Sequence, residues 1–244
     1  MADHRGKNKR DCCGARPAAD AAEPSHGGAI AAAENVMTSR ITVLCALLGV
    51  LLSIAFVDRP LSLWAYDNFH ATRLFYHNLT VPVEGMKILA LAGLIWCGAL
   101  FASGRALAGR HAAILRLSLA TLTAMAVKDL LKFGFGRTWP ETWVNANPSF
   151  ITDHVFAFAP FHGGTGWSAF PSGHEAVAAA FCAALWALAP RLRALCVVIV
   201  LVVAAGLIGA DEHWLSDVIA GGLVGWLIGA LLARVDLPKV GGPG

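Results

Sequence analysis

Six long apolar runs restrict what this chain of 244 residues can fold into. Each run is close to the roughly 20 residues that a helix needs to cross the hydrocarbon core of a bilayer. In hydrocarbon only helices and closed barrels satisfy their backbone polar groups, and runs without strict alternation favour helices. We therefore expect an all-α polytopic membrane protein, a bundle of six transmembrane helices. The six runs are Ile41–Val57, Val83–Ala102, Ala112–Val127, Glu175–Pro190, Ala194–Ala210 and Val218–Ala233.

The composition supports a membrane protein. Hydrophobic residues make up 57% of the chain and charged residues 14%, whereas about 25% of the residues in a soluble domain are charged. The net charge is only +3 and the basic residues form no patch, so we expect no nucleic-acid partner. Two of the six cysteines lie near the N-terminus and four lie in spans, which favours inert thiols over a disulfide framework.

The distribution of polar residues predicts three parts. Residues 1–40 are small, polar and charged, which predicts a disordered cytoplasmic tail. Residues 41–235 would form the membrane domain and residues 236–244 a short C-terminal tail. We expect Asp58-Arg59-Pro60 to stop the first helix. The aromatic and polar mixture of Leu61–Thr80 then predicts an interfacial helix, either an anchor or a lid at the lipid entrance.

The positive-inside rule orients the predicted bundle. With six spans, both termini and the loops after the second and fourth spans share one side, and the basic residues there make it cytoplasmic. The opposite side, which holds the long connection Lys132–Gly173, is then extracytoplasmic. The basic residues of the cytoplasmic side are Arg5, Lys7, Lys9, Arg10, Arg16, Arg40, Arg105, Arg110, Arg191, Arg193, Arg234 and Lys239.

A first polar cluster, Lys128–Pro140, leaves the third span on the extracytoplasmic side. Lys128 and Lys132 are four residues apart and share a helix face. The glycines that follow let Arg137 turn back toward the bundle. Taken alone, the two lysines would be interfacial residues that snorkel to the headgroups.

The second polar cluster, Pro171-Ser172-Gly173-His174, opens the fourth span. Ser172 is a natural N-cap, and Gly173 lets the backbone come close to a ligand. The free N–H groups of a helix start suit an anion such as phosphate, and His174 would place a proton donor beside it. Taken alone, the cluster is equally a capped helix with an incidental histidine.

The third polar cluster, Asp211–Asp217, joins the last two spans. His213 and Asp217 are four residues apart, so the carboxylate can reach the imidazole and fix its tautomer. Alone, this would be a structural polar pair. The convergence of three such clusters on one membrane face favours a functional site.

The order and spacing of the clusters resemble the type 2 phosphatidic acid phosphatase (PAP2) superfamily. Its pattern is Lys-x6-Arg-Pro, then Pro-Ser-Gly-His, then Ser-Arg-x5-His-x3-Asp. Pro171–His174 matches the second motif in full, and His213-x3-Asp217 matches the end of the third. The resemblance covers roughly Lys128–Gly222 by motif and the whole bundle by layout.

The resemblance implies a role for each matched residue. His213 would be the nucleophile that takes the phosphoryl group, and Asp217 would hold its ring. His174 would be the general acid for the leaving oxygen. Ser172 and the N–H of Gly173 would bind phosphate oxygens. No cofactor or metal is needed for two imidazoles that divide the work in this way.

Two arginines of the family pattern are missing. Trp139 stands in place of the first, and Gly206-Leu207 in place of the Ser-Arg pair. A preorganised donor on a phosphoryl oxygen can be worth ~10²–10³ in rate. We therefore expect Arg137, with Lys132 or Lys128, to supply the missing positive charge as phosphate ligands.

Acidic residues beside the motifs allow two interpretations. If Glu175, Asp211 and Glu212 face the site, they would disfavour a highly anionic substrate and could receive an amine or a hydroxyl-rich headgroup. Alternatively they pair with the lysines or face water. Aromatic residues of the long connection, among them Trp143 and Trp167, suit a cap over a lipid.

The sequence thus predicts a metal-independent membrane phosphatase that acts through a phosphohistidine. Its substrate would be a lipid phosphomonoester or pyrophosphate of the polyprenyl, glycerophospholipid or lipid A type. The predicted location is a bacterial inner membrane, with the active site facing the periplasm or the outside. The alternatives are a lipid phosphotransferase that uses the same histidine and a non-catalytic lipid-binding protein. The spans exclude a soluble haloperoxidase of the superfamily.

Overall fold

The computed structural model describes residues 40–143 and 146–237, so nearly all of both predicted tails lies outside the described residues. Within these ranges the chain forms helices, and extended structure is limited to isolated β-bridges. A helical segment over residues 40–52 comes first. The elements that follow are η1 (Ser53–Val57), α2 (Asp58–Phe69), η2 (His70–Thr72), α3 (Arg73–Asn78), α4 (Pro82–Ala102), α5 (Arg110–Phe135), α6 (Phe150–Asp153), η3 (Thr165–Trp167), α7 (Gly173–Leu188), η4 (Pro190–Leu192), α8 (Arg193–Gly209) and α9 (Leu215–Leu232).

Each predicted span coincides with a helix, which confirms the all-helical class of membrane protein. Among the described residues, three helical stretches are long and apolar enough to cross a membrane: Arg40–Ala102, Pro190–Gly209 and Leu215–Leu232. Helix α7 is apolar but has only 16 residues, and α5 carries several charged side chains. The number of six spans therefore stays a prediction.

Large apolar side chains face outward along these helices. They are more than half exposed at positions on the first helical segment, α4, α8 and α9. A soluble monomer rarely exposes so much contiguous apolar surface, whereas lipid covers it without cost. The outward-facing residues include Leu44, Leu51, Ile88, Leu201 and Leu231.

The expected helix stop at Asp58-Arg59-Pro60 is wrong. The chain stays helical through η1, and α2 begins directly at Asp58. Pro60 lies in the first turn of α2, directly after the π-helical turn η1, so its missing N–H falls where the backbone hydrogen-bond pattern changes. The side chain of Asp58 turns inward and is buried.

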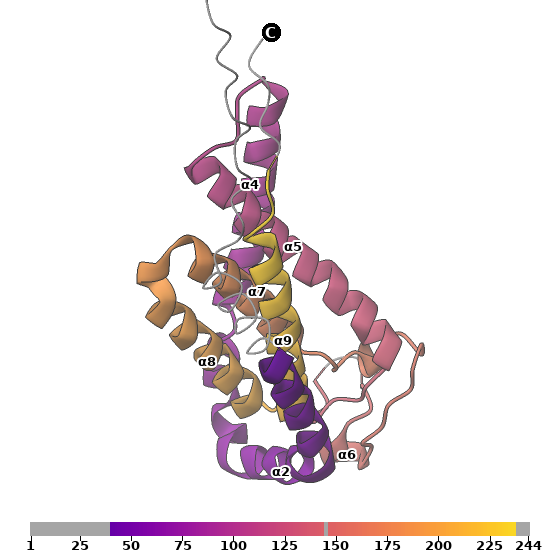
Figure 1. Ribbon diagram of the computed structural model, residues 1–244. Coiled ribbons are helices and arrows are strands. Elements are labelled where there is room, and N and C mark those ends of the chain that lie inside the picture. The colour runs from indigo at the N-terminus through magenta and orange to yellow at the C-terminus, as the bar shows by residue number, and fades with distance from the viewer. Residues whose placement is uncertain (1–39, 144–145, 238–244) are drawn as a thin grey trace, which may run out of the picture. The chain divides into compact units, whose positions relative to one another are not determined.

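Helices α7 and α9 make the most extensive helix contact of the described chain, and Figure 1 shows them side by side. A Cβ at Gly225 would lie 2.1 Å from the carbonyl oxygen of Ala176, and one at Gly221 would lie 2.5 Å from that of Ser172. Gly229 makes the same kind of approach one turn later. These glycines let the two backbones touch, which brings the second and third polar clusters together.

Gly136 ends α5 in the left-handed region, with φ +58°. There the chain turns back, as expected, and the backbone carbonyl of Arg137 accepts from the N–H of Ala169. A bond from Ala159 N–H to the Gly136 carbonyl (2.7 Å) ties the connection to the end of α5. The segment between α5 and α7 is therefore fixed against the bundle, with Arg137 directed inward.

Candidate active site

The three polar clusters meet around one cavity of about 570 Å³. Helices α4 and α5, the start of α7 and the turn before α9 form its walls, and the segment around Gly164 and Trp167 borders it. Each of the three predicted clusters therefore contributes residues to the same cavity. The polar and aromatic residues of the cavity wall include Glu84, Lys128, Lys132, Trp139, Gly173, His174, Glu212 and His213.

His213 and Asp217 form the pair that their spacing predicts. The Nδ1 atom of His213 lies 3.2 Å from Oδ2 of Asp217, and both side chains are buried. A carboxylate can only accept, so Nδ1 carries the hydrogen and Nε2 keeps its lone pair. Burial lowers the pKa of His213, an effect that the bond to Asp217 opposes. The ring is thus held as a neutral imidazole with one nucleophilic nitrogen.

His174 lies in the first turn of α7, on the wall of the same cavity. Its Nε2 atom lies 3.2 Å from Oε1 of Glu84 on α4. Because the carboxylate only accepts, Nε2 carries a hydrogen that is directed toward Glu84, which also lines the cavity. Glu84 was missed by sequence reasoning, since nothing local links a residue of α4 to the start of α7.

Ser172 does not line the cavity. It caps α7, with its Oγ accepting from the N–H of Glu175 at 3.4 Å. Its own N–H donates to the carbonyl oxygen of Asp217 at 3.0 Å. Gly173 does line the cavity, so the start of α7 reaches the position where an anion was expected.

Two lysines of α5 lie against the start of α7. A Cβ at Gly173 would lie 2.8 Å from Cδ of Lys128, so the glycine makes room for that side chain. Lys132 donates to the carbonyl oxygen of Ser168, and its Nζ atom lies 5.1 Å from the ring centre of Trp139. Lys128 pairs with Asp129. Both ammonium groups thus have partners at the cavity rim that a more anionic ligand can replace.

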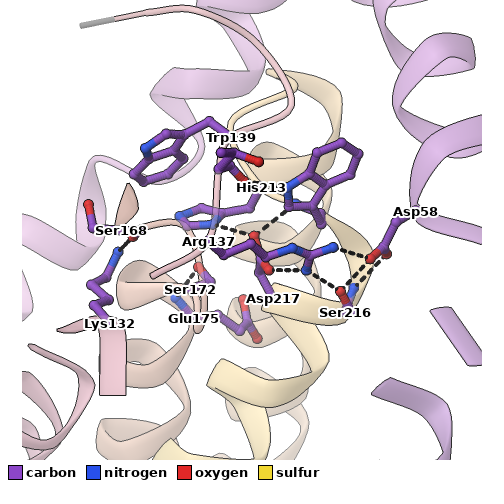
Figure 2. A network of polar contacts seen from close by, with 12 residues as sticks. Asp58, Lys132, Arg137, Trp139, Ser168, Ser172, Glu175, His213, Ser216 and Asp217 are labelled. Atoms are coloured by element: carbon purple, nitrogen blue, oxygen red, sulfur yellow. Dashed lines mark hydrogen bonds and ion pairs between the residues drawn. The ribbon is translucent and has the colours of Figure 1, made fainter. Parts of the chain in front are cut away.

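Arg137 lies behind the His213–Asp217 pair and is absent from the cavity wall. Its Nη1 atom donates to Asp217 at 2.5 Å and to Ser216 Oγ at 2.6 Å, and Nη2 donates to Asp58 at 2.7 Å (Figure 2). The guanidinium is 1% exposed. The structure therefore separates Arg137 from Lys132, with which it was expected to hold phosphate.

Trp139 and Leu207 occupy the positions of the two missing family arginines, and both make structural contacts. The ring of Trp139 lies 4.9 Å from that of His213, and its Nε1 donates to the carbonyl of Thr165 at 2.7 Å. Leu207 is fully buried in an apolar cluster with Val83 and other residues. None of the described residues that line the cavity is an arginine.

The acidic neighbours separate into two groups. Glu212 lines the cavity and lies 2.6 Å from His77 Nδ1. Asp211 is buried and accepts from Ser62 Oγ at 2.9 Å, and Glu175 is buried against α9. The expectation that these acids pair with the lysines or face water is wrong for Asp211 and Glu175, because both turn into the protein. Burial raises the pKa of Asp211 to about 7.

Metal-ligating side chains do not gather in the described part of the chain. Over residues 40–143 and 146–237, no group of three or more His, Cys, Asp and Glu side chains has the geometry to hold an ion. The groups that the cavity wall offers to a ligand include two imidazoles, lysine ammonium groups and the start of α7 at Gly173.

The family model of the PAP2 superfamily matches residues 113–239, which contain all three clusters. The chain belongs to this superfamily. It is 36% identical over 94 residues to a lipid A 1-phosphatase of Rhizobium johnstonii. The aligned residues make up 38% of this chain and 35% of that protein. It is also 34% identical over 115 residues to a lipid A 1-phosphatase of Rhizobium etli, covering 46% and 45%.

The match thus spans less than half the length of each of these PAP2 relatives. No solved structure matches the chain. The family assignment agrees with the sequence expectation and with the meeting of Pro171–His174 and His213–Asp217 at one cavity.

Proposed function

We propose that this PAP2 protein is a membrane-embedded phosphatase that hydrolyses a lipid phosphomonoester or pyrophosphate. One observation carries the proposal: His213 and His174 line the same cavity, and Asp217 holds His213 from behind. A protein that only binds lipid has no need of a buried histidine with an orienting carboxylate.

In the first step, Nε2 of His213 attacks phosphorus and the bond from phosphorus to the lipid oxygen breaks. Burial and the neighbouring His213 lower the pKa of His174 to about 4 in the empty cavity, so His174 acts as the acid when the substrate phosphate beside it stabilises its charged form. The charged His174 then gives a proton to that oxygen as the lipid leaves. Asp217 stabilises the positive charge that develops on the His213 ring. The products are the lipid alcohol, or a lipid monophosphate from a pyrophosphate, and a phosphohistidine.

In the second step, water attacks the phosphohistidine and gives its proton to the now neutral His174. The bond from phosphorus to Nε2 breaks, and inorganic phosphate leaves. His213 returns to its neutral form and His174 to its protonated form. Both steps need positive charge around the phosphoryl oxygens. Lys132, Lys128 and Gly173 line the cavity, and in this proposal the two ammonium groups and the N–H of Gly173 bind those oxygens.

Lipid phosphates are the substrates that suit this cavity. Its wall combines lysines with the aromatic rings of Trp139, Trp143 and Trp167, and the surrounding helices expose apolar side chains. The names of the Rhizobium relatives make a lipid A phosphate one candidate. Polyprenyl and glycerophospholipid phosphates have the same combination of anionic head and apolar tail.

We assign the chain to a bacterial inner membrane with the cavity open to the periplasm, on the positive-inside pattern of its basic residues. A single cysteine at the exposed position Thr152, in a chain freed of its other cysteines, tests this. A thiol reagent that cannot cross membranes should label it in intact spheroplasts. Labelling only after lysis would place the cavity on the cytoplasmic side.

Phosphate release tests the activity itself. Purified protein in detergent is incubated with lipid A, polyprenyl pyrophosphate and phosphatidic acid, and free phosphate is measured. At least one lipid should be hydrolysed, and His213→Ala should abolish the release. The proposal fails if no lipid is hydrolysed, or if His213→Ala is as active as the parent chain.

A further inference from the structure

A second buried carboxylate lies behind the catalytic pair. Asp58, from the start of α2, is 1% exposed and lies next to the start of α9. Its Oδ1 atom accepts from the N–H of Ser216 at 3.0 Å, and its Oδ2 atom accepts from Ser216 Oγ at 2.5 Å. A carboxylate is seldom buried unless it is paired, so the partner of Asp58 indicates the role of its side chain.

That partner is Arg137, which bridges two carboxylates. It donates to Asp58 through Nη2 and to Asp217 through Nη1, as Figure 2 shows. Aromatic rings of Phe156, Phe158 and Trp214 lie 4.8–5.1 Å from its guanidinium carbon. The guanidinium is thus fixed in place, with its charge shared between two anions.

We propose that Asp58 and Arg137 are positioning residues that fix Asp217 and, through it, the ring and charge of the nucleophile His213. The inference rests on the proposed function for what His213 does, and on the buried contacts for how it is held. It gives Arg137 a role in orienting the nucleophile and adds a residue from a helix remote in sequence to the site.

The charge balance explains why two carboxylates are needed. If Asp58 were absent, the whole positive charge of Arg137 would act on Asp217. That charge would make the Asp217 carboxylate a weaker partner for His213. Asp58 takes part of that charge and leaves Asp217 more negative. It also holds the guanidinium away from the cavity, where an arginine would otherwise be drawn to the substrate phosphate.

Four other groups act on His213 and must be held constant. Asp217 of α9 and Glu212 of the preceding turn favour its charged form, and Lys132 of α5 disfavours it. His174 of α7 faces the same cavity. A test of the proposal therefore compares variants that leave these four residues unchanged.

The test measures His213 directly, without substrate. Diethyl pyrocarbonate reacts with the neutral form of an imidazole and not with the protonated form. The pH midpoint of modification at His213, assigned by peptide mass spectrometry, therefore follows its protonation. Asp58→Asn removes a negative charge and should move the midpoint down. Arg137→Gln removes a positive charge and should move it up. The double variant, with two neutral amides, should return toward the parent midpoint.

Kinetics supply the second measurement. Asp58→Asn and Arg137→Gln should lower kcat by up to about 100-fold and leave KM nearly unchanged, because neither side chain touches substrate. Asp67→Asn, an exposed acid on the same helix α2, should change neither quantity. If Asp58→Asn does not fold, the double variant and Arg137→Gln still carry the comparison.

The outcomes are distinct. Midpoints that move in the same direction, or not at all, overturn the positioning role. A rise in KM for Arg137→Gln as large as that for Lys132→Gln overturns it as well and makes Arg137 a phosphate ligand. If the midpoints move in opposite directions but the parent chain hydrolyses no lipid, the positioning role stands and the proposed function fails.

Discussion

Ser172 donates its backbone N–H to the carbonyl oxygen of Asp217 over 3.0 Å. This bond joins the motif that contains His174 to the motif that contains His213. The two histidines can act on one phosphoryl group only if these helix starts stay in register. The register depends on the close contact of α7 with α9, so the glycines of α9 are part of the site's construction.

Gly225→Ala should therefore destabilise the protein and lower its activity. The added Cβ would lie 2.1 Å from the carbonyl oxygen of Ala176, so the helices must separate. Overpacking of this kind costs typically 1–3 kcal/mol, roughly. Thermal unfolding in detergent and phosphate release measure the two effects.

Gly98→Ala is the matched control for Gly225→Ala. Gly98 lies within helix α4, and a Cβ there would meet no atom within 4 Å. Alanine has a helix propensity about 1 kcal/mol better than glycine, so the control should be neutral or slightly stabilising. Equal unfolding temperatures for the two variants would contradict the packing argument.

His174→Ala should slow the hydrolysis of alkyl phosphates by about 10²–10⁴-fold. The loss should be far smaller with p-nitrophenyl phosphate, because nitrophenolate leaves without needing a proton. The effect is measured as the rates on both substrates, with His111→Ala as the control. His111 lies at the start of α5, whereas the end of α5 lines the cavity. An equal loss on both substrates would mean that His174 binds phosphate and does not act as the acid.

How far the sequence predicts this structure depends on how many residues separate the two partners of each contact along the chain. The pairing of His213 with Asp217 follows from one helical turn, and the apolar runs mark helices such as α4 and α8 directly. Asp58 could not be recognised, because its bond to Ser216 joins positions 158 residues apart. Beside Pro60 it had the local appearance of a helix stop.

Arg137 shows the same limit in another way. The glycines beside it correctly predicted a turn back toward the bundle, and Gly136 makes that turn. Its final partners depend on two carboxylates from α2 and α9, which no spacing rule brings together. Family patterns place an arginine near phosphate, but the structure gives this one buried anions instead.

Lys132→Gln should raise KM and lower kcat/KM by about 10²–10³-fold. Lys132 lines the cavity together with Gly173, and its Nζ atom lies 5.1 Å from the ring centre of Trp139. Arg116→Gln is the control on the same helix, because its guanidinium binds the backbone carbonyl of Val235 away from the cavity. A normal KM for Lys132→Gln would remove the lysine from the proposed phosphate cradle.

The last prediction concerns stability and pH. Burial raises the pKa of Asp211 to about 7, although Ser62 donates to its carboxylate. The unfolded chain releases the same proton near pH 4, at about the ordinary value for aspartate. The stabilising contribution is therefore complete below about pH 4 and is lost as the pH rises to about 7, because the folded state binds the extra proton in that interval.

Asp211→Asn should remove this dependence. The amide is neutral at every pH and can still accept from Ser62, so the variant should resist thermal unfolding better than the parent at pH 8. At pH 5 the difference should be smaller than at pH 8, because most of the contribution of the protonated carboxyl group is still present. Glu141, whose pKa burial also raises, and Arg73 lie near position 211 and are unchanged in the variant, so their own contributions to stability are common to both proteins. Because only the protonation of Asp211 distinguishes the two chains, a stability difference that is the same at both pH values would show that its carboxylate is already ionised in the folded protein.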